Sequence, residues 1–278
     1  RQVVIDLPDI KDREAILNIH AKGKPLAEDA NLKKVAQRTP GFSGADLANV
    51  LNEAAITTAR QNKKIIGNDI VLDSIEKVML GPERKSHVLS DKEKKVTAYH
   101  EAGHAIVANY LKHADPVHKI SIISRGRAAG YTINLPIEDK KMQSQGDFID
   151  EMAVLLGGRV AEKIFFQEVT TGASNDLERA TKIAKRLITR FGMNENLGPR
   201  TLGKQEEMIF LGKDLHEQKD YSEKTAELID QEINKYIAQA VTTAKKVITE
   251  HKEQVEKIVA TLLEKETIEK EEFENLVK

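Results

Sequence analysis

The sequence predicts a mainly α-helical protein with a small β-sheet. Apolar residues recur at helical spacing over most of the 278 residues, whereas only two short segments, about 117–123 and 130–135, have the character of strands. Capping patterns mark where several helices begin. Hydrophobic residues make up 40% of the chain and charged residues 31%, which is enough apolar material for a packed core.

The composition excludes several classes of protein. The 43 basic and 44 acidic residues give a formal net charge of −1, which argues against a nucleic-acid partner. There are no cysteines, so disulfide scaffolds, cysteine-ligated zinc and thiol catalysis are excluded. No apolar run approaches the length of about 18 residues that a membrane span needs. The chain begins with Arg1 and has no signal-peptide pattern, so we expect a piece of a longer protein.

The first part of the chain is predicted to be helical after a short opening strand that ends at Pro8. Helices are expected over about 12–22, 31–38, 44–61 and 68–80. The third is the clearest, because Ser43 and Asp46 form a capping box ahead of apolar residues at helical spacing. The periodicity stops at Gly81-Pro82, where glycine frees the backbone and proline ends a helix. We therefore predict a first domain over 1–80, a linker over 81–87 and a second domain over 88–278. The alternative for Gly81-Pro82 is an ordinary turn between two helices.

The second part contains the longest helical patterns. Ser90 and Glu93 form a capping box that begins a helix of about 91–112. Further helices are expected at about 147–166 and 175–191, and the chain is expected to be nearly all helical from Tyr221 onwards, with Ser222 as a cap. Apolar stripes in this last stretch predict helices that pack on one another.

A candidate metal site lies in the middle of the helix predicted at 91–112. His100-Glu101-Ala102-Gly103-His104 has the pattern H-E-x-x-H, and residues four apart share a helix face, so both imidazoles can bind one zinc ion. Glu101 lies beside that face, where a carboxylate can take a proton from a zinc-bound water. Gly103 inside a helix costs about 1 kcal/mol relative to alanine, which indicates a packing or functional reason. The alternative is two surface histidines beside an exposed glutamate.

A catalytic zinc normally has three protein ligands, and the residues near the motif do not supply the third. A metzincin would have a histidine six residues after His104, where this chain has Tyr110. The stretch 117–137 contains no acidic residue, so the glutamate of a thermolysin-like site is also missing. His113 and His118 flank the end of the helix, and we expect both to be solvated.

The third ligand must therefore come from farther along the chain. The candidates are Glu151 and Glu162 on the helix predicted at 147–166, and Asp176 at the start of the next helix. The alternative for Asp176 is that it stabilises the start of its helix, because acidic residues favour the first turn. The alternative for Glu162 is a solvent-facing position, as for most helical glutamates. The residues alone leave this choice open.

Further motifs resemble the FtsH family of membrane-anchored AAA+ zinc proteases. The resemblance in the second domain lies in Thr97-Ala98-Tyr99-His100-Glu101-Ala102-Gly103-His104-Ala105, Asp115-Pro116-Val117-His118-Lys119-Ile120, Leu156-Gly157-Gly158-Arg159-Val160-Ala161-Glu162 and Thr171-Gly172-Ala173-Ser174-Asn175-Asp176-Leu177. In the first domain, Thr39-Pro40-Gly41-Phe42-Ser43-Gly44-Ala45-Asp46-Leu47 resembles the helical lid of that family's ATPase module. The resemblance implies a helical AAA+ lid subdomain followed by a mostly helical zinc metalloprotease domain with a small β-sheet.

The resemblance also implies which residues act. His100, His104 and Asp176 would hold one Zn²⁺ per chain, and Glu101 would activate the water that attacks a peptide carbonyl. The strand near 130–133 would pair with an extended substrate, which would allow broad sequence tolerance. The alternative for this segment is an ordinary edge strand.

Nucleotide contacts are a second implication of the resemblance. His20, Gly44 and Ala45 match lid positions that line the adenine pocket of related ATPases, and their alternative explanation is ordinary helix packing and capping. Arg1 matches an arginine that faces the neighbouring subunit's nucleotide. The chain has no G-x-x-x-x-G-K-[ST] loop, so we expect ATP and Mg²⁺ to act only in the full-length protein.

For the parent protein the resemblance implies a zinc endopeptidase that degrades unfolded or membrane proteins with energy from ATP. It would be a homo-hexamer, held in the cell membrane by a segment absent from this chain, with this soluble portion in the cytoplasm. The apolar stripes between Ala226 and Leu263 would contribute to ring contacts, unless they are buried within one subunit. A different class stays open, namely a helical assembly or adaptor module with a structural or degenerate metal site. Glu101 separates the two, because a structural zinc needs no base beside its ligands.

Overall fold

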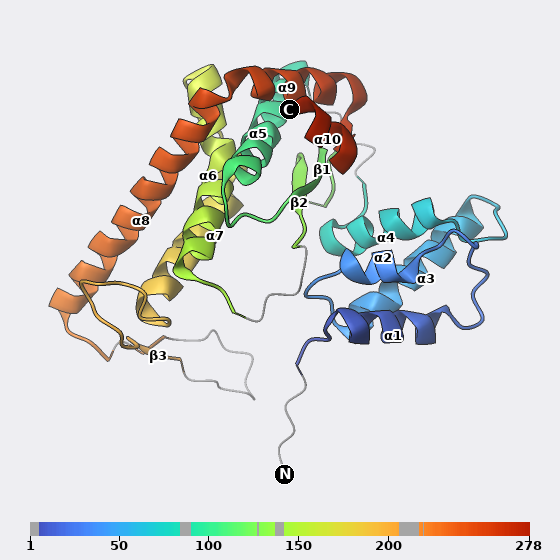
Figure 1. Ribbon diagram of the computed structural model, residues 1–278, viewed down its shortest axis with the longest axis horizontal. Coiled ribbons are helices and arrows are strands. Elements are labelled where there is room, and N and C mark those ends of the chain that lie inside the picture. The colour runs from blue at the N-terminus through green and yellow to red at the C-terminus, as the bar shows by residue number, and fades with distance from the viewer. Residues whose placement is uncertain (1–5, 84–89, 127, 137–141, 206–216, 219) are drawn as a thin grey trace, which may run out of the picture.

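In the computed structural model, two groups of helices lie on either side of a small β-sheet (Figure 1). The structure describes residues 6–83, 90–126, 128–136, 142–205, 217–218 and 220–278. The strand predicted at the start of the chain falls largely on residues 1–5, and Arg1 is one of them, so both predictions lie outside the described residues.

The first group contains four helices around one apolar core. They are α1 (Ile10–Ala21), α2 (Leu32–Gln37), α3 (Gly44–Arg60) and α4 (Asn68–Leu80). The predicted capping box at the start of α3 is present, with Ser43 bonded to the main chain of Asp46 and Asp46 bonded back to Ser43. Leu17, Leu47 and Leu51 are fully buried where α1 and α3 pack together.

The second group is built around a larger core that includes residues from each of its α-helices. These are α5 (Asp91–Tyr110), α6 (Gln145–Phe166), the short 3₁₀ helix η1 (Thr171–Ala173), α7 (Ser174–Thr189), α8 (Glu223–Glu250), α9 (Lys252–Lys265) and α10 (Lys270–Leu276). Helix α5 is central, because every residue from Thr97 to Ala108 is buried. No helix of the described residues is long and apolar enough to cross a membrane.

Gly103 lies where α5 crosses α6. A Cβ atom at this position would come within 2.5 Å of the main-chain oxygen of Gly157 and 2.7 Å of the Cβ of Ala161. Only glycine allows the two backbones to approach so closely. The unfavourable glycine predicted inside this helix therefore has a packing reason, which fixes the metal-site face of α5 against α6.

The main sheet has three antiparallel strands in the order β2-β1-β5. They are β1 (Val117–Ser121), β2 (Tyr131–Asn134) and β5 (Thr267–Glu269), and a separate two-residue pair joins β3 (Lys204–Gln205) to β4 (Glu217–Gln218). The first two strands were predicted. The prediction that the chain is nearly all helical from Tyr221 onwards misses β5, which is too short to show a period of its own. The predicted fold class, mainly α with a small sheet, is confirmed.

The sheet contacts the first group of helices through side chains of β1, of β2 and of the segment between them. Glu76 of α4 is buried and accepts hydrogen bonds from Lys119 Nζ at 2.6 Å and from the Tyr131 hydroxyl at 2.8 Å. Arg125, in the segment between β1 and β2, donates to Asp73 of α4 at 2.6 Å. The two groups of helices are thus joined through the sheet by ion pairs and a tyrosine.

Candidate metal centre

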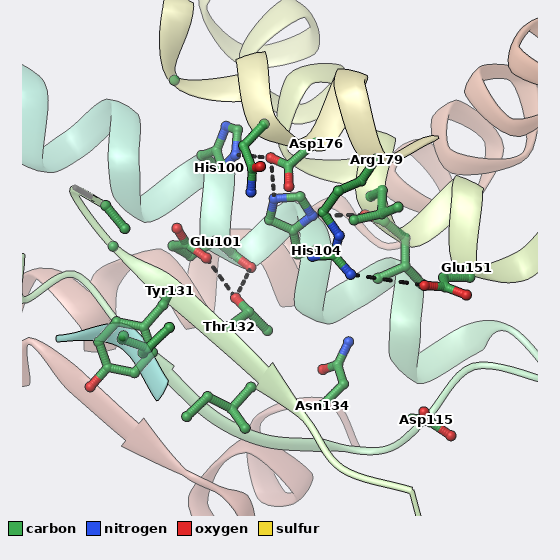
Figure 2. A pocket seen from close by; sticks show the side chains of 18 of the residues that line it. His100, Glu101, His104, Asp115, Tyr131, Thr132, Asn134, Glu151, Asp176 and Arg179 are labelled. Carbon is green, nitrogen blue, oxygen red and sulfur yellow. Dashed lines mark hydrogen bonds and ion pairs between the residues drawn. The ribbon is translucent and has the colours of Figure 1, made fainter. Parts of the chain in front are cut away.

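Helices α5 and α7 bring three side chains to one point (Figure 2). His100 and His104 lie one turn apart on α5, and Asp176 comes from the first turn of α7. The Asp176 Oδ2 atom is 3.4 Å from His100 Nε2 and 3.5 Å from His104 Nε2. A tetrahedral zinc with bonds of about 2.0–2.1 Å keeps its ligand atoms roughly 3.4 Å apart, so these residues fit the ion.

The remaining nitrogen of each imidazole has its own hydrogen-bond partner. His104 Nδ1 is 2.7 Å from the main-chain oxygen of Val154, and His100 Nδ1 is 2.6 Å from Glu162 Oε1. A carbonyl oxygen can only accept, so His104 Nδ1 carries a hydrogen and Nε2 is the nitrogen that is left to bind a metal ion. The Glu162 carboxylate has the same effect on His100 and is itself held by the N–H of Thr170 at 2.6 Å. Such partners fix the ring orientation of metal-binding histidines.

Of the three acidic residues that the sequence leaves open, the structure brings only Asp176 to both Nε2 atoms. Glu162 is 1% exposed, so the expectation of a solvent-facing helical residue is wrong, and it contacts the opposite nitrogen of His100. Glu151 lies 3.8 Å from the guanidinium of Arg179. The alternative of two surface histidines is also wrong, because His100, Glu101 and His104 are all buried.

The two nearby histidines differ in exposure. His113 is exposed, as predicted. The prediction for His118 is wrong, because it is half-buried on β1 and its Nε2 atom is buried with no hydrogen-bond partner among the described residues.

The carboxylates give the metal centre a strongly negative electrostatic potential. Burial disfavours the charged form of His100, but hydrogen bonds to Asp176 and Glu162 outweigh it and raise the pKa of His100 to about 10. Burial would raise the pKa of Asp176, but its contacts with both imidazoles lower that pKa well below the ordinary value. Burial raises the pKa of Glu101. Three carboxylates around two imidazoles favour a divalent cation at this point.

A cleft with a volume of about 1270 Å³ passes over the metal centre. Strand β2 forms one wall, with Thr132 and Asn134 directed into the cleft (Figure 2). Residues of the first helix group also line it, namely Pro40, Gly41, Met79 and Leu80. The cleft is large enough for an extended peptide, and pairing of β2 with such a peptide stays a prediction.

Thr132 has a role that the sequence did not reveal. Its hydroxyl donates to Glu101 Oε2 at 2.7 Å, across the space between β2 and α5. The only signal in the sequence is the alternation within a four-residue strand, which places Thr132 and Tyr131 on opposite faces but does not say what either face meets.

The predicted nucleotide contacts lie in the first helix group, away from the metal centre. His20 is exposed in the last turn of α1. Gly44 is the first residue of α3, packed toward α1, and Ala45 beside it is exposed. These positions leave the prediction of nucleotide binding untested.

Two family models match the chain. The model for peptidase family M41 matches residues 87–276, which is more than half of the chain. The chain belongs to peptidase family M41. A model for the AAA+ lid domain matches residues 29–72, so the M41 part is preceded by lid sequence.

The curated relatives of this M41 chain are named as zinc metalloproteases. An ATP-dependent zinc metalloprotease FtsH 1 of Sphaerobacter thermophilus is 52% identical over 276 residues, which are 99% of this chain and 42% of the relative. The FtsH 3 protein of Symbiobacterium thermophilum is 51% identical over 278 residues, 100% of this chain and 44% of the relative. The FtsH protein of Veillonella parvula is 49% identical over 278 residues, 100% of this chain and 43% of that protein. The chain thus spans about two fifths of the length of these relatives.

The comparisons confirm two predictions from the sequence, the resemblance to the FtsH family and the assignment to the metallopeptidases. They do not test the roles of single residues.

Proposed function

We propose that this chain hydrolyses peptide bonds in the cleft over the metal centre, as the zinc endopeptidase part of a longer ATP-dependent protease. One observation carries the proposal. The two Nε2 atoms and the Asp176 carboxylate converge at zinc-binding distances, directly beside the buried carboxylate of Glu101. Membership of peptidase family M41 and the names of the relatives give it independent support.

Different residues of the chain have different roles in the proposed hydrolysis. A zinc ion held by His100, His104 and Asp176 supplies Lewis acidity, which lowers the pKa of water and polarises a carbonyl. Glu101 accepts a proton from the attacking water and later delivers it to the nitrogen of the leaving amine as the C–N bond breaks. Glu162 and the main chain of Val154 keep both imidazoles in the required tautomer.

The number of ligands favours this function over the adaptor alternative. Structural zinc sites are closed by four protein ligands, whereas catalytic sites use three and keep a position for water. Within the described residues, the cluster at this point consists of three side chains. It also opens into the large cleft, as a site that must admit substrate requires.

For the parent protein, we propose a lid over residues 1–80, a linker over 81–87 and a peptidase domain over 88–278. The positions of the two family matches support these boundaries. The further proposals are a homo-hexamer, ATP and Mg²⁺ bound with help from His20, Gly44 and Ala45, a membrane anchor outside this chain and a cytoplasmic location for this part. Their support is the similarity to relatives named ATP-dependent zinc metalloprotease FtsH. The substrates would be unfolded or membrane proteins.

The substitution Glu101→Gln tests the proposed chemistry, because glutamine cannot accept the proton. We expect cleavage of fluorescein-labelled casein to fall at least about 100-fold, the lower range for general acid–base catalysis. Zinc content, measured by mass spectrometry, should stay at the wild-type level. Glu178→Gln is the matched control, since Glu178 is exposed and lines the same cleft. Undiminished cleavage by the Glu101→Gln variant would contradict the proposal.

A further inference from the structure

The base proposed for catalysis is held by a strand, not by a neighbouring helix. Glu101 projects from α5 toward β2, and the Thr132 hydroxyl lies 2.7 Å from its Oε2 atom. Figure 2 shows Thr132 directed at Glu101 and Tyr131 directed away from it. The same hydroxyl is 3.3 Å from the main-chain oxygen of Glu101, so its single proton goes to the closer, charged acceptor.

Strand β2 is held in place on its other face. Tyr131 donates from its hydroxyl to Glu76 of α4 at 2.8 Å, and Arg125 Nε lies 3.3 Å from the same hydroxyl. Main-chain pairing with β1 adds a second constraint, with Ser121 opposite Tyr131 and Ile120 opposite Thr132. A hydroxyl on a strand fixed in this way has a defined position relative to α5.

The residue before β2 allows the approach. A Cβ atom at Gly130 would lie 2.6 Å from Thr97 Cγ2, 2.8 Å from the main-chain oxygen of Ser121 and 3.0 Å from Glu101 Cγ. Any larger residue would push the strand away from α5 and lengthen the bond between Thr132 and Glu101. The lack of a side chain at Gly130 thus lets β2 lie close enough to α5 for this hydrogen bond to form.

We infer that Thr132 is a positioning residue for Glu101, an inference that rests on the proposed function. A carboxylate rotates freely about its last torsion, and a buried one with a single fixed donor takes the orientation that this donor selects. Thr132 occupies Oε2, so Oε1 is the oxygen turned toward the water that is to be deprotonated. The hydrogen bonds that the structure describes for the Thr132 hydroxyl both go to Glu101, so Thr132 acts through this residue.

The test compares Thr132→Val with Thr132→Ser. Valine keeps the shape of threonine and removes the hydroxyl, whereas serine keeps the hydroxyl. Thr267→Val is the matched control, because Thr267 lies on β5 in the same sheet and its hydroxyl contacts Ser121 at 3.0 Å. Cleavage of a quenched-fluorescent peptide gives kcat and KM, metal analysis gives zinc content, and crystal structures show the Glu101 carboxylate.

We expect kcat of the Thr132→Val variant to fall about 10- to 100-fold, the worth of a hydrogen bond to a charged group, with KM changed less than about twofold. Thr132→Ser should keep at least about a third of wild-type kcat. Zinc content should match wild type in all variants, and the Glu101 carboxylate should leave its position only in the valine variant. If valine disturbs folding, judged by the unfolding midpoint, Thr132→Ala gives the same comparison without the added methyl group.

Two results would overturn the inference. One is a Thr132→Val variant with kcat within about twofold of Thr267→Val while Glu101→Gln is inactive, which leaves the proposed function intact. The other is an unmoved Glu101 carboxylate in the valine variant. If Glu101→Gln itself cleaves normally, the proposed function fails, and the inference fails with it.

Discussion

The two faces of strand β2 meet two clusters of charged groups that balance their charge in different ways. The metal centre consists of Glu101, Glu162, Asp176, His100 and His104. The interface cluster, between the sheet and α4, consists of Asp73, Glu76, Glu83, Lys119 and Arg125. Tyr131 faces the interface cluster and Thr132 faces the metal centre, because neighbouring residues of a strand point to opposite faces.

The difference lies in the cations. In the interface cluster, Lys119 and Arg125 are permanently charged and lie 2.6 Å from Glu76 and Asp73 respectively. The chain therefore supplies the positive charges of this cluster from its own side chains. In the metal centre, the described groups that face the carboxylates are imidazoles, and hydrogen bonds to Asp176 and Glu162 raise the pKa of His100 to about 10 despite its burial. A buried site that attracts positive charge so strongly, and that contains no lysine or arginine among the described residues that form it, is suited to bind a metal ion.

The largest effect that we expect in either cluster follows substitution of Asp176. Replacing it with alanine removes a proposed ligand and one of the carboxylates, so we expect zinc affinity to fall by at least about 100-fold. A chelator competition titration measures this change. Glu178→Ala on the same helix, exposed at the edge of the cleft, is the control and should bind zinc like wild type. Unchanged affinity after Asp176→Ala would transfer the ligand role to Glu162 or Glu151.

In the interface cluster, the corresponding change should cost folding stability and leave zinc binding alone. Glu76→Ala removes the acceptor for Lys119 and Tyr131, and we expect the free energy of unfolding to fall by about 1.5 kcal/mol in urea titrations. Replacing both partners, with Glu76→Leu and Lys119→Met together, should recover part of this loss, because no buried charge is then left unpaired. A loss of zinc from the Glu76→Ala variant would contradict the separation of the two clusters.

The smallest effect concerns His118, near the interface cluster. Burial and Arg38 lower the pKa of His118 to about 4, with smaller opposing influence from Glu269 and further lowering by Lys270 and Lys119. Below the ordinary pKa of about 6.5 the unfolded chain gains a proton that the folded protein takes up only near pH 4, so stability is lost as the pH falls through this range. Allowing for partial exposure, we expect a loss of about 1 kcal/mol between pH 7 and pH 5, or roughly 3 °C in the unfolding midpoint.

The substitution His118→Asn should remove that part of the pH dependence, measured by thermal unfolding at the two pH values. His113→Asn is the control, because His113 is exposed. Equal slopes for wild type and the His118→Asn variant would show that this histidine titrates normally in the folded protein.

Most helices were predictable because their signals are local. The capping boxes at Ser43 and Ser90 lie within one turn, and the predicted starts of α3 and α5 agree with the structure. The strand β5 was missed, because three residues acquire strand structure only by pairing with β1. His118 was misjudged for a similar reason, since segments distant in the sequence bury its ring on β1 and bring Arg38 near it.

The sequence by itself determined that His100 and His104 share a face with Glu101 beside them, because the α-helix repeats every 3.6 residues whatever surrounds it. Resemblance to a family, not spacing, pointed to Asp176. Only the tertiary structure decided that Asp176 meets both Nε2 atoms, that Glu162 binds the opposite nitrogen of His100 and that Thr132 reaches Glu101. These contacts depend on how α6, α7 and β2 pack around α5, and packing between distant segments leaves no periodic trace in the chain.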